Sequence, residues 1–136
     1  MLPLTRVDHV SFATHSIDDS LRWFERIFGA REVRRMPNTA EGYTFAELEI
    51  PNSQVGFELI EPLGEDSFVA RFLQERGPGF HHITVEVESV DTAAADLRAN
   101  GVEPFGGVRG SGHWRQTFIH PRDSGGILVQ IVQAGK

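Results

Sequence analysis

The sequence predicts an α+β fold in which two similar βαβββ modules form an open, curved, mixed sheet or barrel. The first observation is an internal repeat: Asp8-His9-Val10-Ser11-Phe12 resembles His81-His82-Ile83-Thr84-Val85, and His9 and His82 are 73 positions apart. The second is a later pair of similar segments, Phe57-Glu58-Leu59-Ile60 and Val129-Gln130-Ile131-Val132, which are 72 positions apart. We therefore expect each module to open and to close with a strand.

The chain of 136 residues is expected to form one domain, 1–136, with modules at about residues 5–64 and 78–134 that share a core. The repeat is too long for a solenoid, whose units usually span about 20–50 residues. A hydrophobic content of 40% and a charged content of 24% are ordinary for a globular protein.

In the first module, residues 6–13 alternate as a strand, and Ser16 to Ser20 supplies N-cap chemistry for a helix over 18–28. This helix would end at Gly29. Its apolar face would consist of Leu21, Phe24, Ile27 and Phe28. The pattern then predicts a strand at 31–36 that ends at a turn at Pro37-Asn38, a hairpin of strands 43–50 and 54–61, and a helix over 67–74.

The second module repeats the order of elements. It is expected to contain a strand at 80–87, a helix over 90–99 that ends at Asn100-Gly101, and strands near 102–106, 114–119 and 126–133. Strands therefore predominate, and the helices would cover one face of the sheet.

Four polar residues stand at the matched strand positions: His9, Glu58, His82 and Gln130. Alternation along a strand sets each of them among mostly apolar neighbours. A single histidine or glutamate in such a place is more often structural, but two matched pairs favour metal binding. A buried glutamate is costly without a partner, and a divalent cation would compensate its charge. Because the chain has no cysteine, the available ligands are imidazole, carboxylate and amide groups.

The other histidines lack a matched counterpart or face elsewhere. His81 would point to the opposite face from His82. His15 and His120 are expected on the surface or in turns, whereas His113 lies in a glycine-rich loop that could border the cavity.

Composition also limits the cellular setting and the partners. We expect a cytoplasmic protein, because no apolar run approaches the roughly 20 residues of a membrane helix and no export signal stands at the N-terminus. A net charge of −6 argues against nucleic acid as a partner. An anionic small ligand remains compatible with the local basic cluster Arg31, Arg34 and Arg35.

The paired layout, with Asp8-His9-Val10 and Gly79-Phe80-His81-His82-Ile83, resembles the vicinal oxygen chelate (glyoxalase/bleomycin-resistance/dioxygenase) superfamily. Within it, residues 61–73 and 79–87 resemble the methylmalonyl-CoA epimerase family. The segment His120-Pro121-Arg122-Asp123-Ser124-Gly125-Gly126-Ile127-Leu128-Val129 does so too. The resemblance covers nearly the whole chain.

This resemblance implies a homodimer in which two modules surround a divalent metal ion such as Co, Mn, Ni, Zn, Mg or Fe. By position, the metal ligands would be His9, Glu58, His82 and Gln130. The substrate, an acyl-CoA thioester, would chelate the metal through adjacent oxygens. The metal would stabilise an enolate while a glutamate moves the α-proton.

Gln130 departs from the family pattern, which usually carries glutamate at this position. An amide oxygen can still bind a metal, but glutamine is neutral and cannot act as a base. The base would then be Glu58, or a glutamate of the preceding strand, where Glu47 is a better candidate than Glu49.

The leading hypothesis is an epimerase or isomerase that moves a proton next to a carbonyl group. Arg115 and His113 would bind an anionic group of the substrate. Three alternatives stay open on the same fold: a glyoxalase I-type lyase, an Fe(II) dioxygenase that uses two histidines and one carboxylate, and a protein that sequesters a ligand without turnover.

Overall fold

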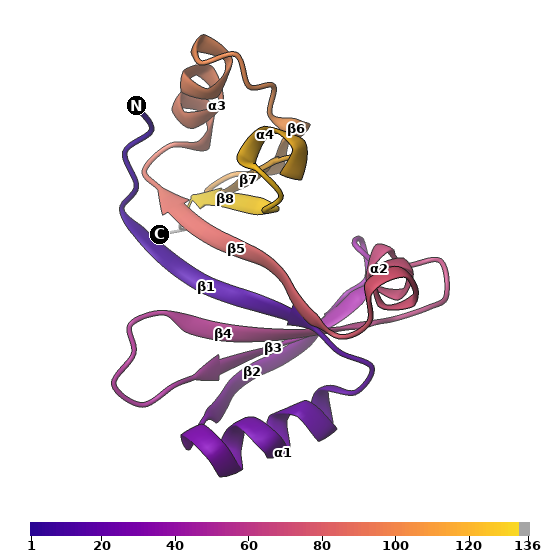
Figure 1. Cartoon of the computed structure of the whole chain (residues 1–136). Helices are drawn as coiled ribbons and strands as arrows, with labels where there is room; N and C mark the ends of the chain where they lie inside the picture. The colour runs from indigo at the N-terminus through magenta and orange to yellow at the C-terminus, as the bar shows by residue number, and fades with distance from the viewer. Residues whose placement is uncertain (134–136) are drawn as a thin grey trace. The chain divides into compact units, whose positions relative to one another are not determined.

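The computed structural model describes residues 1–133, which form eight strands and four helices (Figure 1). In chain order these are β1 (Arg6–Ala13), α1 (Ile17–Phe28), β2 (Arg31–Asn38), β3 (Tyr43–Glu49), β4 (Gly56–Pro62), α2 (Phe68–Arg76), β5 (Gly79–Val87), α3 (Val90–Ala99), β6 (Phe105–Ser111), β7 (Trp114–Ile119), α4 (Pro121–Ser124) and β8 (Val129–Gln133). No helix of this described part is long and apolar enough to cross a membrane.

The strands neighbour one another in the order β2-β3-β4-β1-β5-β8-β7-β6, so β2 and β6 stand at the two ends of the sheet. β1 pairs with β4 and β5 pairs with β8 in parallel, whereas the hairpins β2–β3, β3–β4, β6–β7 and β7–β8 are antiparallel. The predicted α+β class, with a mixed and open sheet, is confirmed.

The chain packs as two compact units. The first unit is residues 9–81, and the second unit is residues 1–8 together with residues 82–133. The predicted module limits of 5–64 and 78–134 stay a prediction, and residue 134 lies outside the described residues.

In the first unit, α1 is defined by its capping residues. The Ser16 hydroxyl accepts a hydrogen bond from the Asp19 N–H, and Gly29 ends the helix in the left-handed region at φ 68°. Ile17 and Leu21 are buried in a core with residues of β3 and β4, among them Ala46, Leu48 and Leu59. α1 therefore covers one face of this half of the sheet (Figure 1).

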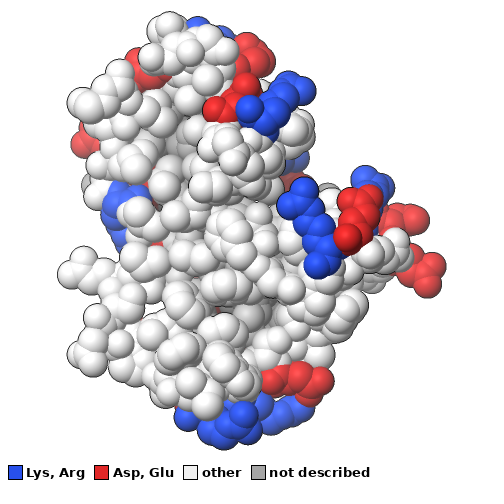
Figure 2. All heavy atoms as spheres, viewed as in Figure 1, with Lys and Arg blue, Asp and Glu red and all other residues white. Residues whose placement is uncertain are grey.

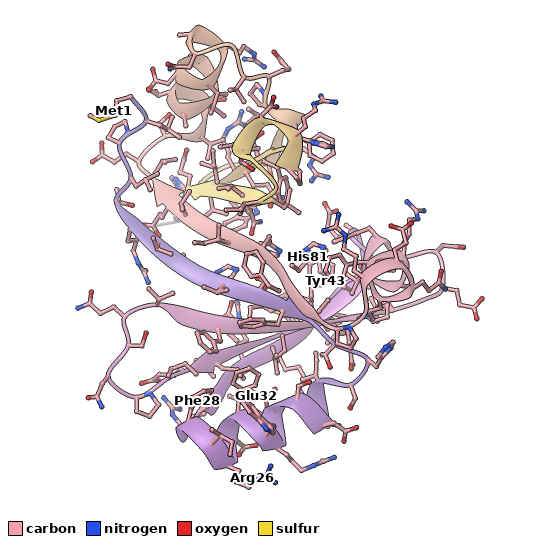
Figure 3. The ribbon with its side chains drawn as sticks, viewed as in Figure 1. Met1, Arg26, Phe28, Glu32, Tyr43 and His81 are labelled. Carbon is pink, nitrogen blue, oxygen red and sulfur yellow. The ribbon has the colours of Figure 1, made fainter. Side chains whose placement is uncertain are left out.

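The apolar face predicted for α1 is wrong for its last two members. Ile27 and Phe28 are 51% and 47% exposed. Ile27 lies off the stripe that Ile17 and Leu21 define, and the Phe28 ring contacts the Trp23 ring of its own helix, at 5.6 Å between centroids. Figure 3 labels Phe28 at this outer end of α1.

α2 packs on a second core within the same unit. Its Val69 and Leu73 contact Ala13 of β1 and Ile60 of β4. Ile60 and Glu58 are two positions apart on β4, whereas Leu59 between them belongs to the core under α1. Glu58 therefore points to the face of the strand opposite α1.

The second unit repeats this construction. Ser89 caps α3 by accepting a hydrogen bond from the Thr92 N–H, and buried Val90 and Leu97 pack against Val85 and Ile131 of the neighbouring strands. Val90 stands where Ile17 stands in the first unit, since the two are 73 positions apart.

The repeat extends to the polar contact that holds each helix start. The Ile17 N–H donates to Glu61 Oε2 over 2.8 Å, and the Val90 N–H donates to Gln133 Oε1 over 3.0 Å. Both acceptors lie near the end of the closing strand, β4 in one unit and β8 in the other. Corresponding strands thus anchor corresponding helices by the same bond.

The strands β2, β6 and β8 differ from the prediction for reasons that the structure shows. β2 continues through Pro37 and Asn38, because an edge strand tolerates a residue without an N–H group. β6 spans Phe105–Ser111 rather than 102–106, and Val102 instead donates its N–H to the Leu97 carbonyl after α3.

β8 begins only at Val129, not at 126, because the residues before it form an additional helix. Pro121 at its start and the capping His120 side chain favour the short helix α4. Gly125 and Gly126 then adopt φ values of 80° and 115°, which interrupt extended backbone.

Candidate metal and catalytic site

In the first unit, Glu58 is a buried carboxylate that two side chains contact. β1 and β4 run in parallel with Ser11 beside Glu58, and the Ser11 hydroxyl donates to Glu58 Oε1 over 2.7 Å. His9 Nε2 lies 3.5 Å from the same oxygen. Glu58 is 8% exposed, so these contacts sit in a largely water-excluded place. The structure therefore brings together His9 and Glu58, two of the four predicted ligands.

Glu47 lies on β3 opposite Glu58 of β4. It is the direct partner of Glu58 across the antiparallel pair β3–β4, and directly opposed residues share a face. Arg34 of β2 stands opposite Glu47 in turn, and its Nη2 lies 2.6 Å from Glu47 Oε1. Glu47 thus shares a face with the buried carboxylate while its own carboxylate stays partly open to solvent.

The second unit holds the other two predicted ligands on neighbouring strands. His82 is 6% exposed on β5, and Gln130 lies on β8 next to β5. Thr84 and Gln130 are register partners, and the Thr84 hydroxyl donates to Gln130 Oε1 over 2.7 Å. Gln130 Nε2 donates to Gln116 Oε1 of β7 over 2.6 Å.

The two units therefore use one local arrangement. A hydroxyl residue two positions after the histidine, Ser11 or Thr84, donates to the carboxylate or amide at the matched position. Neither hydroxyl residue was predicted as part of the site, although the two stand 73 positions apart like the histidines and both are fully buried. Gln116 was not predicted either, because no pattern in the sequence marks it.

His81 has an apolar setting. Its ring centroid lies 4.8 Å from that of Phe72 and 5.5 Å from that of Phe68, both on α2, and Figure 3 shows it next to this helix. Burial lowers the pKa of His81 to about 4; the Glu58 charge acts in the opposite direction, and the Arg76 charge lowers it further. His81 is therefore neutral at pH 7.

His113 and Arg115, the predicted binders of a substrate anion, lie at and after the β6–β7 turn. His113 is exposed. Arg115 Nη2 lies 2.7 Å from Asp91 Oδ1 of α3, and its buried Nε has no hydrogen-bond partner within the described residues. Their role toward a substrate stays a prediction.

The other polar candidates make local contacts. His15 is exposed, and His120 caps α4 while its ring packs against Phe105 at 4.7 Å between centroids. Each arginine of the predicted basic cluster has an acidic partner: Arg31 with Glu49, Arg34 with Glu47, and Arg35 with Asp18 and Glu32. Figure 2 shows blue and red side chains next to one another at the places where Figure 1 draws α1 and α2.

Comparison with known proteins places this geometry in a family. Residues 8–118 match the family model described as Glyoxalase/Bleomycin resistance protein/Dioxygenase superfamily. The mitochondrial methylmalonyl-CoA epimerase of Homo sapiens is 32% identical over 134 residues, which span 96% of this chain and 75% of that protein.

Solved structures agree with the sequence comparison. The crystal structure of methylmalonyl-CoA epimerase from Mycobacterium tuberculosis matches with a TM-score of 0.89 and 33% identity, over 100% of this chain and 94% of that one. A methylmalonyl-CoA epimerase in complex with methylmalonyl-CoA and NH4+ matches with a TM-score of 0.88 and 34% identity, over 98% and 96% of the two chains. The chain therefore belongs to the methylmalonyl-CoA epimerase family of the glyoxalase/bleomycin resistance protein/dioxygenase superfamily.

Proposed function

We propose that this protein epimerises the α-carbon of an acyl-CoA of the methylmalonyl-CoA type, and that it does so at a divalent metal ion. The observation that carries the proposal is buried Glu58, with His9 and Ser11 against it, in a chain whose relatives are methylmalonyl-CoA epimerases. The proposed metal ligands are His9, Glu58, His82 and Gln130.

The donor set fits a divalent cation. His9 and Glu58 of the first unit and His82 of the second supply imidazole and carboxylate groups, a donor set that could hold a metal ion. Gln130 would add an amide oxygen. Glu58 supports this assignment because a buried carboxylate that accepts a hydrogen bond from one hydroxyl gains much from a positive charge. A bound divalent metal would act as a Lewis acid that stabilises negative charge on a carbonyl oxygen.

Epimerisation needs a group that removes the α-proton. The C–H bond breaks, its electron pair moves toward the thioester carbonyl oxygen, and a carboxylate takes the proton. A solvent-derived proton delivered to the other face of the α-carbon inverts it, and the carboxylate releases its own proton to solvent. We propose Glu47 for this transfer, because it shares a face with Glu58 across β3–β4 and is not itself among the proposed ligands. Glu58, the other predicted base, would be occupied by the metal.

Deuterium exchange tests this proposal. Purified protein loaded with Co(II) would be incubated with methylmalonyl-CoA in D₂O, and α-deuterium incorporation would be followed by NMR. We expect exchange that depends on the metal. Glu47→Gln should lower the exchange rate by at least about a hundredfold, the usual weight of a general base, while Co(II) stays bound. Glu58→Gln should instead weaken Co(II) binding.

Glu49→Gln is the matched control, because Glu49 lies two residues further on the same strand, is exposed and pairs with Arg31. Full activity of Glu47→Gln, or equal losses in the two variants, would contradict the assignment of the base. Stoichiometric Co(II) in a His9→Ala, His82→Ala double variant would refute the metal site.

Several finer predictions belong to the same proposal. They are a homodimer, a cytoplasmic location and substrate contacts by Arg115 and His113. Bound Co(II) without any exchange would support the metal site but indicate a different reaction. The alternatives are then a glyoxalase I-type reaction on a thiol adduct and an Fe(II)-dependent oxygenation. Tight ligand binding without metal or turnover would instead indicate a sequestering protein.

A further inference from the structure

Both ends of the Gln130 amide are held by hydrogen bonds within the second unit. Its oxygen accepts from the Thr84 hydroxyl over 2.7 Å, and its nitrogen donates to Gln116 Oε1 over 2.6 Å. β8 lies between β5 and β7 in the sheet, so the amide oxygen is directed toward β5 and the NH₂ group toward β7. β5 is the strand that carries His82.

The direction of this amide matters because its two ends differ chemically. A carboxylate offers an oxygen on either side, whereas an amide offers one oxygen that can bind a cation and one NH₂ group that can only donate. A glutamine in place of a glutamate ligand therefore needs something to fix which end faces the metal.

We propose that Gln116 is a positioning residue that fixes this orientation, so that Gln130 can serve as a metal ligand despite its departure from the family pattern. The inference rests on the proposed metal site. Gln116 Oε1 accepts a hydrogen bond from the Gln130 NH₂ group, and reversal of the Gln130 amide alone would bring two amide oxygens together at the same 2.6 Å distance. Gln116 is thus predicted to act through Gln130 rather than on the substrate.

The surroundings of Glu58 in the first unit allow a comparison, because the proposed ligand there is a carboxylate. Glu58 accepts from Ser11 as Gln130 accepts from Thr84. Gln116 is the register partner of Val132, and the position that corresponds to it is Phe45, the partner of Ile60. An amide acceptor therefore stands at this register position in the unit that carries the glutamine, and an aromatic residue stands at it in the unit that carries the glutamate.

The orientation can be tested without metal. In ¹⁵N-labelled apoprotein, the Gln130 side-chain NH₂ signal is identified by its loss in Gln130→Glu. We expect Gln116→Met, which keeps the size of the side chain but removes the acceptor, to shift this signal upfield in its protons. Gln74→Met on the exposed face of α2 is the control and should leave it in place. An unchanged Gln130 signal in Gln116→Met would overturn the proposal.

The consequence for the metal is tested by Co(II) titration calorimetry in two backgrounds. With Gln130 present, Gln116→Met should weaken Co(II) binding about fivefold, the weight of one neutral hydrogen bond. In the Gln130→Glu background the same change should cost less than about twofold, because a carboxylate has no wrong end. Equal losses in both backgrounds would overturn the proposal. Absence of Co(II) binding to the unmodified protein would refute the proposed function, while the apoprotein NMR still decides the orientation.

Discussion

Protonation of His81 should destabilise the fold in mildly acidic solution. The imidazole packs against Phe72 and Phe68 of α2, and burial is the main reason why its pKa falls from 6.5 to about 4. Because the folded state disfavours the charged ring, protons bind the unfolded chain more tightly than the folded one. The contribution of neutral His81 to the unfolding free energy is therefore fully present above pH 6.5. It decreases as the pH falls below 6.5 and is lost once the pH has fallen through about 4.

The size of this effect follows from the two pKa values. A difference from 6.5 to about 4 corresponds to about 3 kcal/mol of unfolding free energy, at about 1.4 kcal/mol for each unit. Between pH 6.5 and 4, the change in unfolding free energy caused by this group alone approaches about 1.4 kcal/mol per pH unit. A loss of this size is a large fraction of the roughly 5–15 kcal/mol that holds a domain folded.

Urea unfolding followed by circular dichroism measures this loss. Samples contain a chelator, so that metal binding at neighbouring His82 does not contribute. His81→Phe keeps an aromatic ring beside Phe72 but cannot take up a proton, and His81→Gln removes the ring as well. Both variants should show a shallower decrease in unfolding free energy from pH 7 to pH 4 than the unmodified protein. Parallel decreases in all three proteins would refute the reasoning.

Two further perturbations test the fold. Gly110→Ala should destabilise the β6–β7 hairpin by at least about 2 kcal/mol in urea unfolding, because Gly110 has a φ of 109° and an added Cβ would lie 2.2 Å from the Trp114 carbonyl oxygen. Gly64→Ala, which meets no atom within 4 Å, is the control. Ser16→Ala and Ser89→Ala should each cost about 1 kcal/mol in the same assay, because each removes the N-cap of its helix. Unequal losses of unfolding free energy in the two variants would show that the repeated caps do not contribute equally to stability.

The sequence was sufficient to predict the architecture because the patterns that indicate it are local and repeated. Alternating strands, the caps Ser16 and Ser89, and Gly29 at a helix end are signals of a few neighbouring residues, and the 73-residue repeat supplied the opening strand and the serine cap twice. Boundaries failed where tertiary position overrides local preference. Pro37 remains in a strand because β2 is an edge, and the exposure of Phe28 depends on where the sheet lies under α1.

The sequence by itself determined which residue types stand at the candidate site: His9, Glu58, His82 and Gln130 all came from the repeat. Only the tertiary structure decided which side chains contact these four residues. Strand register decides three of these contacts. It places Ser11 beside Glu58, Glu47 opposite Glu58, and Gln116 within hydrogen-bond distance of Gln130. Register brings together residues that are distant along the chain, and it is fixed by the packing of the whole sheet rather than by any local pattern.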